Sequence, residues 1–185
     1  MTQHTLVVGG TGMLAGLCET LHQQGHLLTI LSRSERRFAH LARGRSGFHH
    51  LALDYTDASA LCEGLQAALA ERGPISLAVC WVHSTAPHGL TNICEELLKA
   101  VESLEVVHVV GSAWANPARL LSPLEKQLRS LSSLRYKQAI LGFQLVGETS
   151  RWLTDEEISA GVWEAVQSEQ DTTIVGVVKP WSRRP

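Results

Sequence analysis

Residues 5–16 of the chain read TLVVGGTGMLAG, and this stretch decides the fold. The apolar residues 5–8 predict a short strand, and residues 13–24 predict a helix. Between them, Gly9, Gly10, Thr11 and Gly12 form a turn that is rich in glycine. A strand, a glycine turn and a helix in this order are typical of the first unit of an α/β fold.

The rest of the chain repeats the alternation of strand and helix. We expect strands at residues 5–8, 27–31, 48–53, 75–82, 106–110, 135–146 and 172–178, and helices at 13–24, 34–42, 57–72, 91–103, 122–131 and 154–168. Residues 75–82 (ISLAVCWV) form a nearly unbroken apolar run, which is typical of a strand covered on both faces. The sequence therefore predicts a doubly wound parallel sheet of about seven strands with helices on both faces, a Rossmann fold.

Length and composition indicate one globular domain over residues 1–185. Hydrophobic residues make up 44% of the chain and charged residues 18%, with a formal net charge of −2. Such a charge gives no field that would attract nucleic acid. No run reaches the roughly 20 apolar residues of a membrane span, and the N-terminus does not read as a signal peptide, so we expect a cytoplasmic protein with no membrane contact. The four cysteines lack the spacing of a zinc site, and we expect reduced thiols and no metal.

The glycine turn predicts a phosphate site. Residues 9–15 fit the pattern G-x-x-G-x-x-A, in which missing side chains let a pyrophosphate approach the amides at the start of a helix. We expect these residues to bind a dinucleotide: Gly9, Gly10, Thr11, Gly12, Met13 and Leu14. A tight turn without a ligand is the alternative. A Walker loop is excluded because no Gly-Lys-Ser/Thr ends the turn.

The end of the second strand indicates which nicotinamide cofactor is preferred. An NAD site would place Asp or Glu there, but the chain has Ser32 and Arg33, followed by Arg36 and Arg37. A hydroxyl and a guanidinium suit a phosphate group, so NADP(H) is favoured over NAD(H). The alternative interpretation is the solvated start of an ordinary helix.

With these motifs, the sequence resembles the short-chain dehydrogenases/reductases of the atypical branch, the NmrA-like and biliverdin-reductase-B-like group. The resemblance rests on residues 9–15, on Ser32-Arg33 and on residues 53–57 (LDYTD). It implies that Asp54 and Tyr55 lie near the adenine. It also implies that His83 and Ser84 after the fourth strand, and Gly111 and Ser112 after the fifth, border the nicotinamide, with Ser112 as the candidate catalytic residue.

The sequence departs from that family at its proton relay. The helix expected at residues 122–131 has no tyrosine, so the family's Tyr-x-x-x-Lys pattern is absent from it. Tyr136 and Lys137 are adjacent on a predicted strand and would project to opposite faces. Residues 141–144 and 148–152 are expected to line the remaining substrate pocket.

Two functions from different classes follow. The first is an NAD(P)H-dependent reductase that acts on a small conjugated acceptor, for which hydride transfer needs chiefly correct stacking of cofactor and acceptor. The second is a non-catalytic NADP(H)-binding sensor or regulatory protein. An isomerase that uses the dinucleotide transiently ranks third, because it too would need the missing relay. The resemblance also implies pairing through helices, so a homodimer is the expected assembly.

Overall fold

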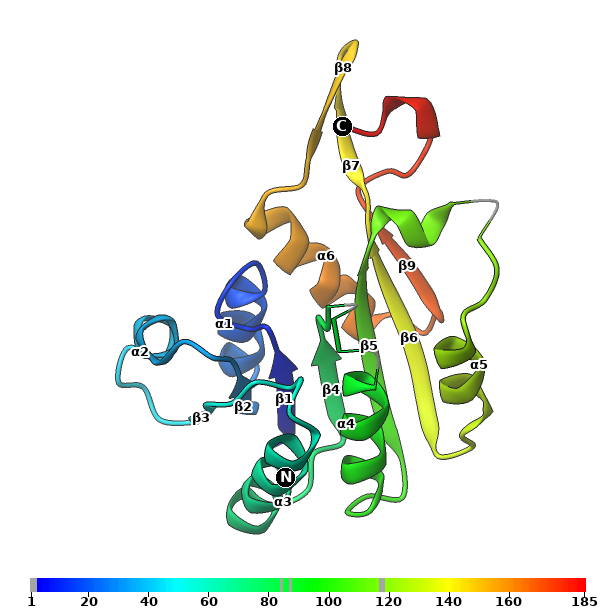
Figure 1. Cartoon of the computed structure of the whole chain (residues 1–185). Helices are drawn as coiled ribbons and strands as arrows, with labels where there is room; N and C mark the ends of the chain where they lie inside the picture. Colours follow the sequence, from blue (N-terminus) through cyan, green and yellow to red (C-terminus); the bar gives the residue numbers. More distant parts are fainter. Residues whose placement is uncertain (1–2, 84, 87, 117–118) are drawn as a thin grey trace.

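The protein is built around a twisted sheet whose strands are all parallel (Figure 1). The computed structural model describes residues 3–83, 85–86, 88–116 and 119–185. In these residues the seven-stranded sheet has the order β3-β2-β1-β4-β5-β6-β9. The strands are β1 (His4–Val8), β2 (Leu27–Leu31), β3 (Phe48–Leu51), β4 (Leu77–Cys80), β5 (Leu104–Gly111), β6 (Leu134–Leu141) and β9 (Thr172–Val175). The strand order reverses between β1 and β4, which confirms the predicted doubly wound Rossmann fold.

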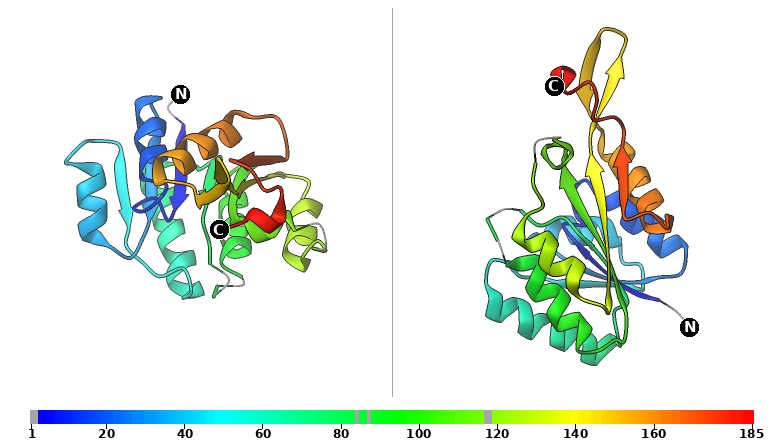
Figure 2. Two further views of the ribbon diagram at one scale, coloured as in Figure 1. Left: turned by 90° about the horizontal axis from the view of Figure 1, so that it is seen from above. Right: turned by 90° about the vertical axis from the view of Figure 1, so that its right-hand side faces the viewer.

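Helices cover both faces of the sheet (Figure 2). The helices α1 (Ala15–Gln23), α2 (Glu35–Ala42) and α6 (Asp155–Gln167) pack on one face, around a core that includes Leu17 and Val162. The helices α3 (Ala58–Arg72), α4 (Gly89–Leu98) and α5 (Pro123–Ser130) cover the other face, around Leu61 and Ile93. Burial of apolar side chains on both faces explains why the strand sequences are hydrophobic almost throughout.

The alternation of side chains along β6 places Tyr136 and Lys137 on opposite faces of the sheet. Tyr136 joins the core beneath α5. Lys137 points the other way, where its Nζ donates to Glu105 Oε1 and to the carbonyl oxygen of Val166 in α6, both at 3.0 Å. The prediction for this pair is confirmed, and neither side chain can assist the other chemically.

The strand predicted over residues 135–146, expected to be long or bent, is interrupted in the structure. The chain breaks at Gly142, and β7 (Phe143–Val146) pairs antiparallel with β8 (Thr149–Trp152) in a hairpin. A Cβ on Gly142 would lie 2.1 Å from the carbonyl oxygen of Val177, so only glycine allows this close approach of two backbones. The β7–β8 hairpin extends from the carboxyl edge of the sheet, beside the C-terminal segment (Figures 1 and 2).

Several predicted boundaries are also wrong by a few residues. Helix α1 begins at Ala15 rather than residue 13, because the preceding residues form turns. Strand β5 begins at Leu104 rather than residue 106, and α4 spans Gly89–Leu98 rather than residues 91–103. Among the described residues, no helix combines the length and apolarity needed to cross a bilayer.

Candidate nucleotide-binding site

The turn after β1 presents unpaired backbone amides. Gly9 N–H donates to the carbonyl oxygen of Leu31, and Ala15 N–H to that of Gly12. Within the described part of the chain, the amides of Thr11, Met13 and Leu14 donate to no protein acceptor. Unpaired amides at the start of a helix attract anions, because they carry the positive end of the helix dipole.

The glycines of this turn meet different geometric demands. Gly9 has φ +82°, a conformation that residues with a side chain rarely adopt. A Cβ on Gly10 would lie 2.8 Å from Cys18 Sγ, so this glycine lets α1 pack on the sheet. A Cβ on Gly12 would meet only the carbonyl oxygen of Gly9, at 3.9 Å. The space in front of Gly12 is therefore open, as a bound pyrophosphate requires.

A pocket of about 360 Å³ gathers the turn with the ends of the neighbouring strands. Most of the residues predicted to bind the cofactor line it: Gly9, Thr11, Gly12, Met13, Ser32, Arg33, Tyr55 and His83. Gly10, Leu14 and Asp54 do not line it. The Leu14 side chain is fully buried in the core, so only its backbone can serve a ligand. Ser84 lies outside the described residues. We call this cavity the turn pocket.

Two of the residues predicted to hold a phosphate are already engaged. The hydroxyl of Ser32 lies 3.0 Å from Nε2 of His50, which turns it toward β3. Arg33 lies 3.7 Å from the carboxylate of Asp54 and is highly exposed. Hydrogen bonds from Thr56 lower the pKa of Asp54, with Arg33 adding to the effect, so this carboxyl is ionised. A phosphate on Arg33 would have Asp54 as a like-charged neighbour.

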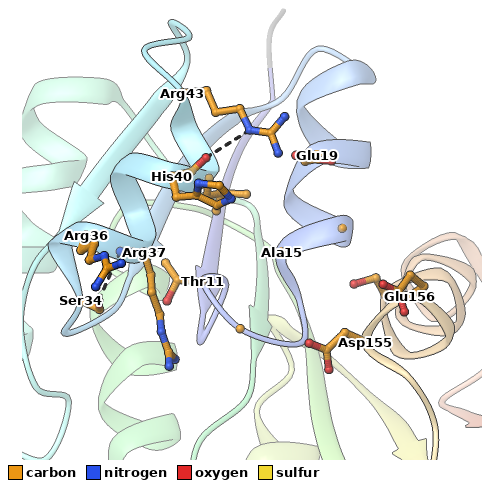
Figure 3. Close-up of a pocket in the computed structure, with 14 residues that line it drawn as sticks. Thr11, Ala15, Glu19, Ser34, Arg36, Arg37, His40, Arg43, Asp155 and Glu156 are labelled. Atoms are coloured by element: carbon orange, nitrogen blue, oxygen red, sulfur yellow. Dashed lines mark hydrogen bonds between the residues drawn. The ribbon is translucent and has the colours of Figure 1, made fainter.

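Arg37 is better placed for a phosphate than Arg33. It lines the turn pocket, and it also lines an adjoining groove of about 860 Å³ between α1, α2 and the start of α6. Figure 3 shows Arg36, Arg37 and His40 of α2 on one side of this groove and Asp155 and Glu156 of α6 on the other, with the start of α1 between them. Arg37 has no carboxylate within 4.0 Å among the described residues. Its guanidinium is therefore free to pair with an anion.

Three aromatic rings form the wall of the turn pocket beyond β3 and β4. Trp81, directly after β4, lies against Gly9, since a Cβ on Gly9 would be 3.4 Å from the Trp81 Cβ. Its indole meets the ring of His83 edge to face at 5.5 Å. The amide of His83 donates to the hydroxyl of Tyr55 at 3.3 Å, which ties the two loops together. This wall offers flat surfaces of the kind on which a purine stacks.

Ser112 begins a 3₁₀ turn, η1 (Ser112–Ala115), at the carboxyl end of β5. It lines a second cavity of about 310 Å³. This β5 pocket also contains Leu141, Gly142 and Trp152, as predicted from residues 141–144 and 148–152, together with Gly111, Ala113, Leu153, Ile158 and Arg184. The Ser112 side chain is buried, and its Oγ accepts a hydrogen bond of 2.8 Å from Arg184 Nε. Because β4 and β5 are neighbours, the two pockets open along one edge of the sheet.

A buried polar network lies beneath α5, away from both pockets. His108 Nδ1 lies 2.7 Å from the Tyr136 hydroxyl, and Gln138 donates to both Tyr136 and Glu125. Burial lowers the pKa of His108 to about 4. Although burial alone would raise it, hydrogen bonds from Arg119, Ser122 and Gln138 lower the pKa of Glu125 to about 2. Burial also raises the pKa of Tyr136, so this phenol is a structural partner and a poor acid.

Sequence reasoning missed three residues of these cavities as site residues. Arg37 belongs to the basic run after the second strand, and its place in the first turn of α2 brings it to the turn pocket. Trp81 read as the continuation of an apolar strand. Arg184 lies more than 70 residues from Ser112, and only the folded tail brings the two together. No group of His, Cys, Asp or Glu among the described residues is arranged to hold a metal ion.

Comparisons with known proteins match the fold of this chain and not its sequence. No protein-family model matches the chain, and no curated protein matches its sequence. Solved structures do match its fold. A short-chain dehydrogenase from Streptomyces avermitilis has a TM-score of 0.74 at 13% identity, over 96% of this chain and 89% of that one. A short-chain dehydrogenase/reductase from Brucella melitensis has a TM-score of 0.71 at 15% identity, over 94% of both chains.

A third similar structure was determined with a nicotinamide cofactor. It is an actinorhodin polyketide ketoreductase with NADPH, with a TM-score of 0.73 at 12% identity over 95% of this chain and 96% of that one. At such identities the likeness establishes architecture alone. The chain therefore has the Rossmann-type fold of the short-chain dehydrogenases and reductases.

Proposed function

We propose that the protein is an NADP(H)-dependent reductase of the short-chain dehydrogenase type, from the atypical branch, that acts on a small conjugated acceptor. The observation that carries the proposal is the turn pocket. There, unpaired amides, the open space before Gly12 and the guanidinium of Arg37 converge at the point where the strand order reverses. Ligands of open α/β sheets bind at this point.

The residues present fit a dinucleotide phosphate. The amides of Thr11, Met13 and Leu14 would bind the pyrophosphate, and Arg37 with the Ser34 hydroxyl would bind the additional phosphate on the adenosine ribose. The aromatic wall at Tyr55 and Trp81 would support the adenine. When bound, the reduced nicotinamide supplies a hydride. NADP(H) remains favoured over NAD(H), with Arg37 rather than Arg33 as the main phosphate ligand.

Ser112 is the group that meets the acceptor in this proposal. Because its Oγ accepts from Arg184, its own proton is free to donate to an acceptor oxygen on which negative charge develops. A tyrosine relay is not part of the mechanism: helix α5 has no tyrosine, and the Tyr136 phenol is bound to His108 and Gln138 in the core.

A non-catalytic NADP(H)-binding sensor is the second candidate. It is favoured by the sequence of helix α5, which has no tyrosine, because the proton relay usual in this family is then missing. Oxidation of NADPH with any member of a panel of flavins, quinones and enones would exclude it. Tight cofactor binding with every acceptor inert would support it.

The decisive experiment is a titration of the protein with NADPH and NADH, followed by fluorescence or calorimetry, with Gly12→Val as the matched variant. The valine would fill the space before the turn, while a Cβ there meets no atom closer than 3.9 Å, so we expect loss of binding with an unchanged melting temperature. A wild-type protein that binds neither nucleotide, or a variant that binds as well as wild type, would overturn the proposal.

A further inference from the structure

The β5 pocket contains a cation whose strongest donors are unused. Arg184 Nε donates a hydrogen bond of 2.8 Å to Ser112 Oγ, and the backbone amide of Arg184 donates to the carbonyl oxygen of Trp181. In the described part of the chain, its two terminal NH₂ groups donate to no protein atom, and no carboxylate lies within 4.0 Å of them. A guanidinium in this state presents the end-on fork that matches a carboxylate.

The guanidinium is held in place by its neighbours. It lies 5.2 Å from the ring centre of Trp152 and 5.5 Å from that of Trp181, so two indoles flank it. The tail that bears it is tied to the β7–β8 hairpin, because Arg183 donates to the carbonyl oxygen of Glu148 and Ser150 donates to that of Arg183. An arginine fixed by stacking and by a hydrogen bond loses little conformational entropy when it binds an anion.

The rest of the cavity is apolar. Trp152, Leu153, Ile158 and Leu141 supply hydrocarbon surface, and Ser112 supplies one hydroxyl. Its volume of about 310 Å³ is near the lower end of the range for small-molecule sites. A small apolar molecule with one anionic group matches this lining, because its charge would meet Arg184 and its body would meet the indole and the aliphatic side chains.

We propose that Arg184 is the specificity-determining residue of the β5 pocket and that it selects a small apolar acceptor with a carboxylate. The carboxylate pairs with the two NH₂ groups of Arg184, and the reducible part of the molecule lies toward Ser112. The assignment of this molecule as hydride acceptor rests on the proposed function. The carboxylate site itself does not.

The test compares two probes of nearly the same shape, the anion cinnamate and its neutral amide, cinnamamide. Binding is followed by NMR through the amide signals of Gly111, Ser112 and Ala113, without nucleotide. We expect wild type to bind cinnamate about tenfold more tightly than cinnamamide, since a partly exposed charge-assisted pair contributes about 1.4 kcal/mol. Arg184→Gln should abolish the preference, and Arg184→Lys should keep part of it, because an ammonium is charged but lacks the fork.

Lys179→Gln is the matched control. It removes one positive charge from the same tail, and among the described residues Lys179 lines a different cavity, with Pro180 and Trp181. This variant should retain the wild-type preference. Equal binding of the two probes by wild type, binding of neither, or a preference that survives Arg184→Gln would overturn the inference. Because nucleotide binding is titrated separately, failure of the proposed function alone would leave the charge preference intact.

Discussion

Gly10 and Gly12 are separated by one residue, yet their surroundings differ completely. Gly10 faces the interior, where Cys18, Val7 and Ile30 surround the position of a Cβ, and Gly12 faces open space. The sequence could predict the turn because three glycines follow a strand. It could not assign these roles, because the packing of α1 on the sheet depends on residues distant in sequence.

Gly10→Ala should destabilise the fold. The added methyl would lie 2.8 Å from Cys18 Sγ and 3.1 Å from Val7 Cγ1, so we expect a loss of about 1–3 kcal/mol in the free energy of unfolding. Chemical denaturation measures it. The double variant Gly10→Ala/Cys18→Ala frees part of that space and should lose less than the sum of the two single variants. Simple additivity would show that the clash is not with Cys18.

Arg37→Gln should weaken NADPH binding about tenfold and leave NADH binding unchanged, because the lost charge pairs only with the additional phosphate. Arg33→Gln should have a smaller effect, since Arg33 already pairs with Asp54. Calorimetry with both nucleotides gives the comparison. A larger loss of NADPH affinity for Arg33→Gln would show that Arg33, the residue predicted from sequence alone, binds the additional phosphate.

At the scale of elements, the layer formed by β5, β6 and α5 buries a polar network that periodicity did not predict. Strands β5 and β6 pair over eight residues, and this register places His108 opposite Gln138 and Val106 opposite Tyr136. Capping of α5 by Ser122 fixes Glu125 above them. His108 is a lone polar residue in an apolar stretch of strand, whereas Tyr136 and Gln138 belong to the polar run at residues 135–138. Only their pairing in space reveals the network.

This network should make stability depend on pH. His108 has a pKa of about 4 in the fold against 6.5 unfolded, so the unfolded chain binds the proton more tightly between these values. The contribution of His108 to the free energy of unfolding is fully present above pH 6.5. It is lost as the pH drops toward 4, which lowers the free energy of unfolding by about 3 kcal/mol. His108→Asn, which can still accept from Tyr136, should lose less stability over that window in urea denaturation at several pH values.

Other groups titrate in both proteins, so the comparison isolates His108. Burial lowers the pKa of His4, His26 and His49 as well, and these add the same trend to wild type and variant alike. Protonation of Glu125 changes the free energy of unfolding only below about pH 4.5. Parallel stability curves for the two proteins would mean that His108 binds a proton as readily in the fold as in the unfolded chain, and would contradict the prediction.

The β7–β8 hairpin shows why element boundaries were the weakest part of the sequence prediction. Residues 135–146 contain no polar turn, and the glycine at position 142 is the only local sign of a change in strand pairing. The change is imposed by Val177, 35 positions later in the chain, whose backbone pairs with Phe143. The hairpin and the tail that it holds build the β5 pocket, so the sequence predicted some of its lining residues but not its cation.

At the scale of the whole molecule, the two pockets share the carboxyl edge of the sheet. The turn pocket lies at the ends of β1 to β4 and the β5 pocket at the ends of β5 and β6, in the same strand order. The alternation of strands and helices made this arrangement predictable, because parallel strands bring all their carboxyl ends together. The substrate side was less predictable, since it is built from a hairpin and a tail rather than from the repeating unit.

The parallel order of the strands also bears on how the chain acquires its structure. Strand β1 lies near the middle of the sheet, yet its neighbour β4 begins more than 70 residues after the start of β1. Strand β6 has both sides paired only once β9 has been synthesised. Contacts between such distant segments form slowly. During synthesis, the early strands therefore have unpaired edges and uncovered apolar faces. We expect the nascent chain to need chaperone protection until its last strand has left the ribosome.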